Sequence, residues 1–159
     1  MNAKFGATST SDDVLAGLEL KGKRVLVTRT SSGLGIETAR ALVAHGAYVV
    51  GAARDLDKAY ATTGTVRAAA ATSSGFELIE VDLGSLASVR ACANKLLLRA
   101  EPFDAVIANA GVMATLHGQR PRCPYDRIDA NGIRVSLRIV GVTRQPVAFC
   151  EVLCAHDGR

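Results

Sequence analysis

A short run of small polar residues and glycines, TRTSSGLG in one-letter code, directly follows an apolar β-branched segment. Within it, the hydroxyls of Ser31 and Ser32 can donate hydrogen bonds to phosphate oxygens. Gly33 and Gly35 allow the backbone to approach an anion closely, and Leu34 stands where the next helix would begin. Because the first N–H groups of a helix have no partner within the helix, this spacing predicts that the loop binds a pyrophosphate group.

Short apolar segments alternate with longer helical patterns along the first two thirds of the chain. The sequence predicts strands over 24–28, 47–52, 76–81 and 103–108, and helices over 34–45, 56–71 and 85–99. Each strand is mostly apolar on both faces and is followed by a helix, which is typical of a parallel sheet buried between helical layers. The predicted fold class is therefore α/β, with a doubly wound, Rossmann-like parallel sheet.

Polar and small residues also stand at the ends of the later strands. These residues are Arg54 and Asp55 after the second strand, Asp82 and Leu83 after the third, and Asn109, Ala110 and Gly111 after the fourth. In an open α/β sheet, ligands bind at the carboxyl ends of the strands. We therefore expect all of these residues to lie near the glycine-rich loop.

The order and spacing of these groups resemble the short-chain dehydrogenase/reductase family, especially its retinol-dehydrogenase-like members. The resemblance covers residues 20–115 and places the family's T-G-x-x-x-G-x-G loop on residues 28–35. It places the family's acidic residue beside adenine on Asp82, and the N-A-G signature on residues 109–111. The resemblance implies a nicotinamide dinucleotide cofactor and, in complete relatives, hydride transfer between that cofactor and a small alcohol or carbonyl substrate.

Two of these positions have a structural alternative. Asp82 and Leu83 would present a carboxylate and a backbone N–H to the adenine ring, or Asp82 would be an acid that stabilises a helix N-terminus. Asn109 would bridge neighbouring strands beneath the cofactor, or it would be a simple turn residue. The ordered set of motifs favours the binding role at both positions.

Arg54 bears on the choice between the two nicotinamide cofactors. An arginine at the end of the second strand can pair with the 2′-phosphate of NADP, whereas an NAD site usually has a carboxylate there. Asp55 is the next residue and keeps NAD open as the alternative. The alternative to a cofactor role is that Arg54 only forms a surface ion pair, for example with Asp57. We predict NADP.

Arg29 departs from the family pattern, because it stands where the family has its first loop glycine. If its φ is positive, the conformation costs about 1–3 kcal/mol. We predict that the side chain crowds the pyrophosphate and that the loop is distorted. The alternative is that the guanidinium reaches a phosphate.

The catalytic half of the family pattern is missing from this chain. The family uses a tyrosine with a lysine four residues later, and no Y-x-x-x-K occurs here. Asn131, within YDRIDAN, is the one candidate for the family's catalytic asparagine. The sequence therefore predicts a truncated, catalytically incomplete oxidoreductase. A non-catalytic module that binds a nucleotide or a protein partner is the alternative.

The predicted organisation is a mobile extension over 1–20, the dinucleotide-binding region over 21–115, and a segment of uncertain structure over 116–159 in the same domain. A short covering helix is expected over 14–20. Lysine is absent after Lys95, and the later apolar stretches 133–142 and 146–153 fit either two strands or a helix and a strand.

Composition excludes several other classes of protein. The net charge of +4 comes without a basic run or an aromatic platform, so we expect no nucleic-acid partner. No apolar run approaches the ~18 residues of a membrane-spanning helix, and we expect no membrane partner and a cytoplasmic location. The four cysteines lack C-x-x-C spacing, so no metal site is expected, with Cys150, Cys154 and His156 as the one alternative. A homo-oligomer stays an option.

Overall fold

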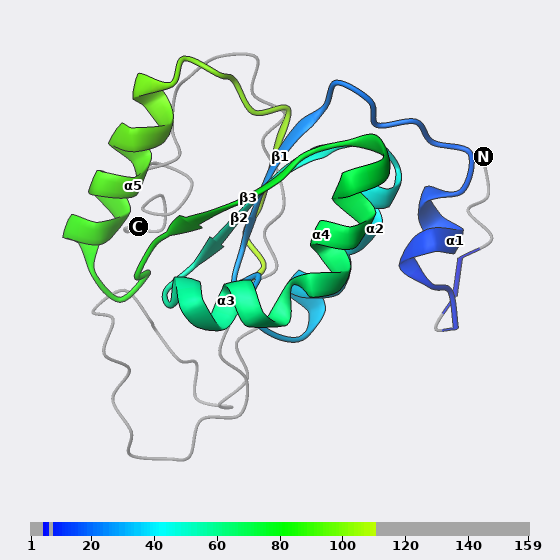
Figure 1. Ribbon diagram of the computed structural model, residues 1–159, viewed down its shortest axis with the longest axis horizontal. Helices are drawn as coiled ribbons and strands as arrows, with labels where there is room; N and C mark the ends of the chain where they lie inside the picture. Colours follow the sequence, from blue (N-terminus) through cyan, green and yellow to red (C-terminus); the bar gives the residue numbers. More distant parts are fainter. Residues whose placement is uncertain (1–4, 7, 111–159) are drawn as a thin grey trace, which may run out of the picture.

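The computed structural model describes residues 5–6 and 8–110, which form a parallel sheet with helices on both faces (Figure 1). The strands are β1 (Arg24–Thr28), β2 (Tyr48–Ala53), β3 (Phe76–Glu80) and β4 (Ala105–Ile107). The helices are α1 (Ser11–Leu15), α2 (Leu34–Ala44), α3 (Leu56–Thr62), α4 (Gly64–Ser73) and α5 (Leu86–Leu98). The α/β class and the doubly wound, Rossmann-like sheet predicted from the sequence are confirmed.

The strand order is β3-β2-β1-β4, and each pair of neighbours is parallel. Thr28 at the end of β1 is in register with Ala52, and Val27 is in register with Ile107. The carboxyl ends of all four strands therefore lie along one edge. The chain moves outward from β1 to β3 and then returns to the other side of β1, so β1 and β4 flank the topological switch point where such sheets bind ligands.

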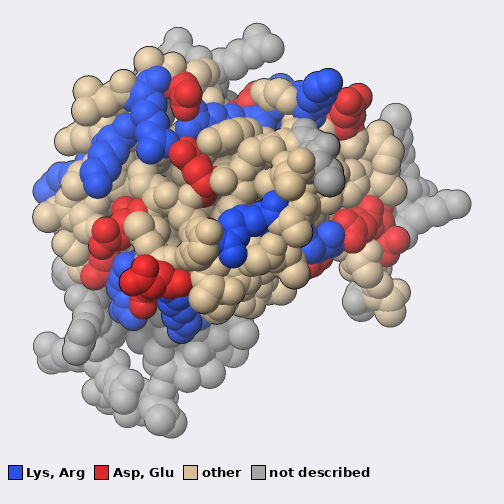
Figure 2. Space-filling model, in the orientation of Figure 1, with Lys and Arg blue, Asp and Glu red and all other residues tan. Residues whose placement is uncertain are grey.

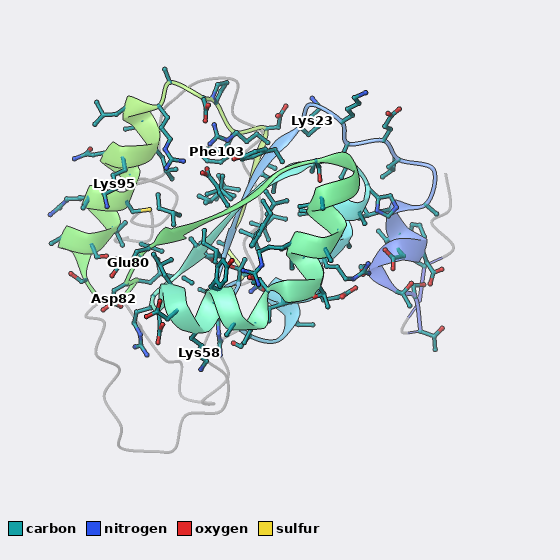
Figure 3. All side chains as sticks on the ribbon, in the orientation of Figure 1. Lys23, Lys58, Glu80, Asp82, Lys95 and Phe103 are labelled. Atoms are coloured by element: carbon teal, nitrogen blue, oxygen red, sulfur yellow. The ribbon has the colours of Figure 1, made fainter. Side chains whose placement is uncertain are left out.

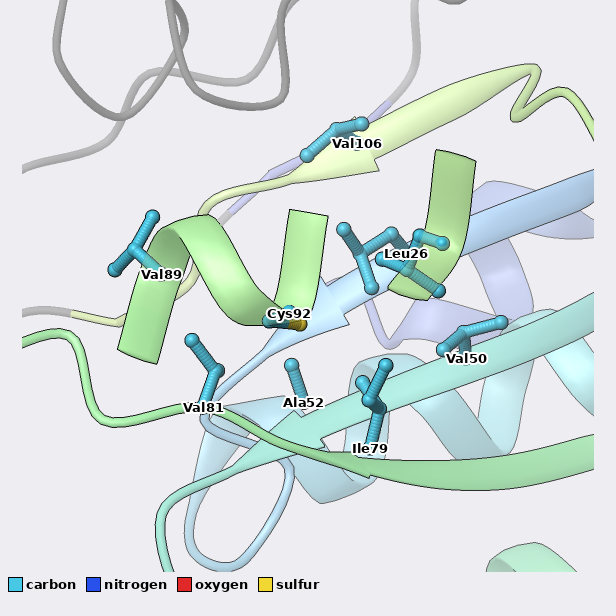
Figure 4. Close-up of a cluster of buried hydrophobic side chains, with 9 residues drawn as sticks. Leu26, Val50, Ala52, Ile79, Val81, Val89, Cys92 and Val106 are labelled. Atoms are coloured by element: carbon cyan, nitrogen blue, oxygen red, sulfur yellow. The ribbon is translucent and has the colours of Figure 1, made fainter. Parts of the chain in front are cut away.

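Alternate residues of the strands enter two hydrophobic clusters. On one face, Leu26, Val50, Ile79 and their neighbours pack against α5 through Val89 and other buried residues (Figure 4). On the other face, residues of β1 and β2 pack against α2 and α4; the buried members are Val25, Val27, Val49, Ala39, Val43, Ala47 and Val66. Burial on both faces explains why the strands are apolar at nearly every position.

The predicted helix over 56–71 is two helices, because the chain turns at Thr63. The buried hydroxyl of Thr63 donates a hydrogen bond to the carbonyl oxygen of Ala59 at 2.7 Å. Such bonding to the preceding turn bends helices, and Gly64 follows with a low helix propensity. The helical pattern alone did not locate this break.

The N-terminal helix begins at Ser11, so the range predicted for it, 14–20, is wrong. Thr10 and Asp13 form a capping box, in which the Thr10 hydroxyl accepts from Asp13 N and the Asp13 carboxylate accepts from Thr10 N. Gly17, with φ +79°, follows the end of the helix. Ser11 donates to Glu37 at 2.6 Å and Asp12 pairs with Arg40 at 2.7 Å, which attaches α1 to α2.

Other helix ends lie close to their predicted positions. His45 ends α2 and Gly46 follows with φ +95°, and Ser85 accepts from Ser88 N as the N-cap of α5. Helix α5 ends at Leu98, four residues before Pro102, through Ala100 with φ +52°. Among residues 5–6 and 8–110, none of the helices has the length and apolarity that spanning a lipid bilayer requires.

Candidate cofactor-binding site

The loop that leaves β1 keeps a tight turn although Arg29 replaces glycine in it. Arg29 has φ +58°, in the left-handed region that residues with side chains adopt at a cost. Thr30 N donates to the carbonyl oxygen of Ala52 at 3.3 Å, which holds the loop against β2. Arg29 thus meets the condition, a positive φ, under which the sequence analysis expects a backbone cost, and the turn runs into α2 at Leu34.

The N-terminus of α2 is open to an anion. Gly33 is the N-cap, with φ +61°, and its lack of a side chain means that no side-chain cap occupies the first N–H groups of α2. Leu34 is 77% exposed, and Ser31 and Ser32 are half-buried beside it. An 11-residue helix with unoccupied N–H groups provides the positive end of a dipole for a phosphate.

Gly35 is required by close packing beneath the loop. A Cβ atom there would lie inside the van der Waals contact distance of the Arg29 carbonyl oxygen and 2.6 Å from Nδ2 of Asn109. Any side chain at position 35 would therefore separate the loop from β4. This packing is the structural reason for the last glycine of the motif.

Asn109 joins the two strands that flank the switch point. Its Nδ2 donates to the carbonyl oxygen of Thr28 at 3.1 Å, and Ala110 N donates to the Thr28 hydroxyl at 2.9 Å. Thr28 is fully buried, whereas Asn109 and Ala110 are half-buried. The bridging geometry expected of Asn109 is present, and it places residues 109 and 110 beside the glycine-rich loop.

Asp82 lies in the turn between β3 and α5, one residue after Val81, whose N–H donates to the Ala53 carbonyl at 2.9 Å. Oδ1 of Asp82 accepts from Gly84 N, and its own N–H donates to the Ser88 hydroxyl, both at 2.9 Å. The N-cap of α5 is Ser85. Asp82 is therefore not the capping residue, and its half-buried carboxylate and Leu83 lie at the carboxyl edge.

Arg54 and Asp55 follow β2 at the same edge. Arg54 is exposed, and the described residues form no ion pair between it and Asp57. Oδ1 of Asp55 accepts from Lys58 N at 2.9 Å and caps α3. Asp55, the residue for which the sequence analysis retained NAD as the alternative cofactor, thus has a structural role as the cap of α3.

Three residues of this region were not identified from the sequence. Thr28 supplies both of the contacts to residues 109 and 110, and Ser88 holds the backbone of Asp82. Thr62 donates to the Ser31 carbonyl at 3.2 Å, which ties α3 to the loop. The hydroxyl residues were visible in the sequence, but their partners are up to 82 positions away.

Neither described tyrosine is placed as the family's catalytic base would be. Tyr48 begins β2 at the amino edge, where the Arg24 guanidinium lies 5.3 Å from its ring centroid and 4.9 Å from that of Phe103. Burial raises the pKa of Tyr48. Tyr60 lies on α3, and the Arg67 guanidinium stacks 3.6 Å from its centroid. Figure 3 shows Lys23 and Phe103 at the amino edge, opposite Glu80 and Asp82.

Two predicted site residues, Gly111 and Asn131, lie outside the described residues, as does the alternative metal set Cys150, Cys154 and His156. Within residues 5–6 and 8–110, no group of three or more His, Cys, Asp or Glu side chains is placed to hold a metal ion. Acidic and basic side chains are interspersed on the face shown in Figure 2.

Residues 23–137 match the short chain dehydrogenase family. The chain belongs to this family. The match includes Asn131 and continues beyond the region that the motifs cover. Short-chain dehydrogenase/reductase prx1 of Penicillium roqueforti is 38% identical over 71% of this chain, and mouse retinol dehydrogenase 11 is 32% identical over 78%. The family predicted from the sequence is thus confirmed.

A solved structure shares the fold of this short-chain dehydrogenase. A metagenomic short-chain oxidoreductase in complex with NADP is 33% identical, with a TM-score of 0.54 over 64% of this chain and 46% of its own. The chain spans about a third of the length of its curated relatives, namely 33% of prx1 and 36% of retinol dehydrogenase 11. The cytoplasmic location predicted from the sequence stays a prediction.

Proposed function

We propose that this chain binds a nicotinamide dinucleotide along the carboxyl edge of its sheet, as the cofactor-binding portion of a short-chain dehydrogenase/reductase. The observation that carries the proposal is the contact between Asn109 and Thr28 across the switch point, directly beneath Gly35. This contact brings the loop and β4 together at the place where open α/β sheets bind ligands.

Each part of the cofactor has a candidate partner. The N–H groups at the start of α2, with Ser31 and Ser32, would bind the pyrophosphate. Asp82 and Leu83 would contact the adenine, and Asn109, Ala110 and Gly111 would form the wall beneath the ribose and nicotinamide. When bound, the cofactor supplies hydride chemistry, and this chain's residues orient it.

We infer a preference for NADP over NAD from two observations on the loop after β2. Arg54 is exposed, and its guanidinium can form charge-assisted hydrogen bonds with a 2′-phosphate. Asp55 caps α3, so one of its carboxylate oxygens is already engaged by Lys58 N.

Calorimetric titration of the full chain with NADP and NAD tests the proposal. We expect NADP to bind more tightly, and Arg54→Ala to weaken NADP binding while leaving NAD binding unchanged. Asp57→Asn, a change of one charge in the first turn of α3, is the control. No binding of either nucleotide contradicts the site, and equal affinities of the unchanged chain contradict only the NADP preference.

The absence of Y-x-x-x-K favours a second candidate, a non-catalytic module that uses the same edge to bind a nucleotide or a protein partner. Steady-state oxidation of NADPH with aldehydes, ketones and quinones distinguishes the two. The oxidoreductase proposal includes a small alcohol or carbonyl substrate, a contribution of Asn131 to proton transfer, and the option of a homo-oligomer. Nucleotide binding without turnover supports the module.

A further inference from the structure

Helix α5 lies apart from the other described helices and covers one face of the sheet (Figure 1). The side chains that it buries against the sheet are Val89, Cys92, Ala93 and Leu96. On the opposite side of the helix, positions 87, 91, 94 and 98 follow one another at intervals of four, three and four residues, so they form a single row. All four are exposed and none is charged. The described residues therefore leave this row of α5 uncovered.

The row ends in the most exposed large hydrophobic side chain of the described residues. Leu98 is 86% exposed, and its neighbour Leu97 is 50% exposed. One exposed leucine is ordinary on a protein surface, but two adjacent ones on an uncovered helix form a small apolar patch. The patch lies at the end of α5 that is farther from Asp82, and hence away from the carboxyl edge of the sheet.

Positive charges flank the row on both sides. With 3.6 residues per turn, Arg90 and Lys95 lie about 70° to either side of the row. Both are exposed, and within the described part of the chain neither forms an ion pair. Helix α5 itself contains no Asp or Glu. Figure 2 shows blue side chains along the region where Figure 1 places α5, so this face favours an anionic partner.

The acidic residues near the C-terminal end of α5 are already paired. Glu77 binds Arg99 at 2.7 Å and Arg24 at 3.2 Å, and Glu101 also binds Arg24. A second copy docked through the same face of α5 would set cations against cations. Residues 111–159 contain more arginines than acidic residues, so they do not complement this face either. The partner that the charges favour is therefore not part of this chain.

An apolar row between cationic flanks fits an anionic lipid surface better than an acidic protein. A helix that lies on a bilayer buries apolar side chains at the headgroup boundary, while lysine and arginine on its flanks reach the lipid phosphates. The cores of protein interfaces are instead enriched in aromatic residues and depleted in lysine. Helix α5 contains no aromatic residue, and its exposed leucines protrude at one end.

We propose that the exposed face of α5 binds an anionic lipid surface, with Leu97 and Leu98 among the headgroups and Arg90 and Lys95 on lipid phosphates. The contact is peripheral, since no helix within residues 5–6 and 8–110 is long and apolar enough to span a bilayer. The expectation of no membrane partner considered spanning segments, whereas a helix that lies on a surface needs no such apolar run. The cofactor site is at the other end of α5, so the proposal does not rest on it.

Co-sedimentation of the full chain with lipid vesicles tests the proposal. We expect the chain to bind vesicles of mixed phosphatidylcholine and phosphatidylserine far more tightly than vesicles of phosphatidylcholine alone. The double variant Arg90→Gln with Lys95→Gln should bind the mixed vesicles more weakly by a factor on the order of ten, because cations near an anionic surface are attracted to it. Leu98→Asn should weaken binding by a similar factor, because it removes apolar area from the contact. High salt should weaken binding of the unchanged chain, because ions screen exposed charges.

The matched controls change similar side chains elsewhere on the surface. Lys21→Gln with Lys58→Gln removes the same number of exposed positive charges, and Leu18→Asn removes a leucine that is 54% exposed. Both controls should bind the mixed vesicles nearly as tightly as the unchanged chain does. Circular dichroism and the thermal midpoint show whether each variant is folded, and Leu98→Ala replaces Leu98→Asn if the latter is not.

A single tryptophan can locate the contact, because the chain contains none. The fluorescence of Leu98→Trp should shift to shorter wavelength on mixed vesicles and should be quenched by brominated lipid, since the ring would lie among the headgroups. Tyr60→Trp places the ring on α3, at a side chain that is 63% exposed, and should show neither effect. Equal changes in the two variants would contradict a contact through α5.

The outcomes keep this inference apart from the proposed function. Equal binding to the two kinds of vesicle would overturn it, and so would losses in the controls as large as those in the α5 variants. Binding to poly-L-glutamate that depends on Arg90 and Lys95, without binding to vesicles, would assign the face to an acidic protein instead. Titration with NADP should give the same affinity for the α5 variants and the unchanged chain, so failure of lipid binding leaves the cofactor site intact. Failure of the unchanged chain to bind nucleotide would in turn leave the lipid contact intact.

Discussion

The side-chain amide of Asn109 bonds to the carbonyl oxygen of Thr28 across 3.1 Å, although the two residues lie 81 positions apart. The contact joins the residues that follow β4 to the last residue of β1. Asn109→Ala should lower the free energy of unfolding by about 1 kcal/mol, the typical loss of one such hydrogen bond. Nucleotide affinity should fall as well, because residues 109 and 110 move relative to the loop.

Urea unfolding and calorimetric titration of the same preparation measure both effects. Asn94→Ala, an exposed position on α5, is the control and should change neither quantity measurably. A loss of stability no larger than that of the control would show that the contact does not contribute.

Gly35→Ala should be strongly destabilising, because its Cβ would collide with the Arg29 carbonyl oxygen and lie 2.6 Å from Nδ2 of Asn109. Overpacking of this kind costs typically about 1–3 kcal/mol. The collision also displaces the loop, so nucleotide binding should be lost. Gly64→Ala is the matched control: a Cβ there meets no atom within 4 Å. The thermal midpoints of the two variants decide the matter, and similar midpoints would contradict the packing argument.

Arg29→Gly should raise the free energy of unfolding by about 1 kcal/mol, because glycine adopts positive φ without the contact between Cβ and backbone that other residues suffer. Ala100→Gly should have a similar effect, since Ala100 has φ +52° against +58° for Arg29. Denaturant midpoints measure both. If Ala100→Gly stabilises and Arg29→Gly does not, interactions of the arginine side chain outweigh its backbone cost.

Glu37 should contribute stability that disappears in acid. The hydrogen bond from the Arg40 guanidinium, followed by that from the Ser11 hydroxyl, lowers the pKa of Glu37 from 4.5 to about 2. A lowered carboxyl pKa stabilises the folded state above the unfolded pKa, and this contribution is lost as the pH falls towards the folded value. Since half of the Glu37 side chain is exposed to solvent, the effect is small.

The measurement is the difference in urea midpoint between the unchanged chain and Glu37→Gln, from pH 7 down to about pH 3. The difference should be constant above about pH 5 and should shrink below it. Glu19→Gln changes an exposed carboxylate between α1 and β1 and serves as control. A difference that grows in acid would contradict the assignment.

The identity of the strands and the type of fold were predictable from the sequence. Residues such as Val25 to Val27 are apolar at consecutive positions because both faces of a parallel sheet are buried, and this pattern is local. The observed strands differ from the predicted ranges by two residues at most, as at β4, which begins at Ala105 where 103 was predicted. The role of the loop glycines and the conformational cost at Arg29 were also predictable, because both depend on backbone angles within one turn.

The roles of individual polar residues were decided only by the tertiary structure. Asp55 could have been a ribose ligand or a helix cap, and the hydrogen bond from Lys58 N identifies it as the cap of α3. Thr63 ends α3 because its buried hydroxyl bonds to Ala59, a choice that the helical pattern did not reveal. Thr28 became part of the site through partners that the sequence places 81 and 82 positions away. Residue types and their periodicity determine which elements form, whereas the partner of a hydrogen-bonding group depends on which elements the folded sheet brings together.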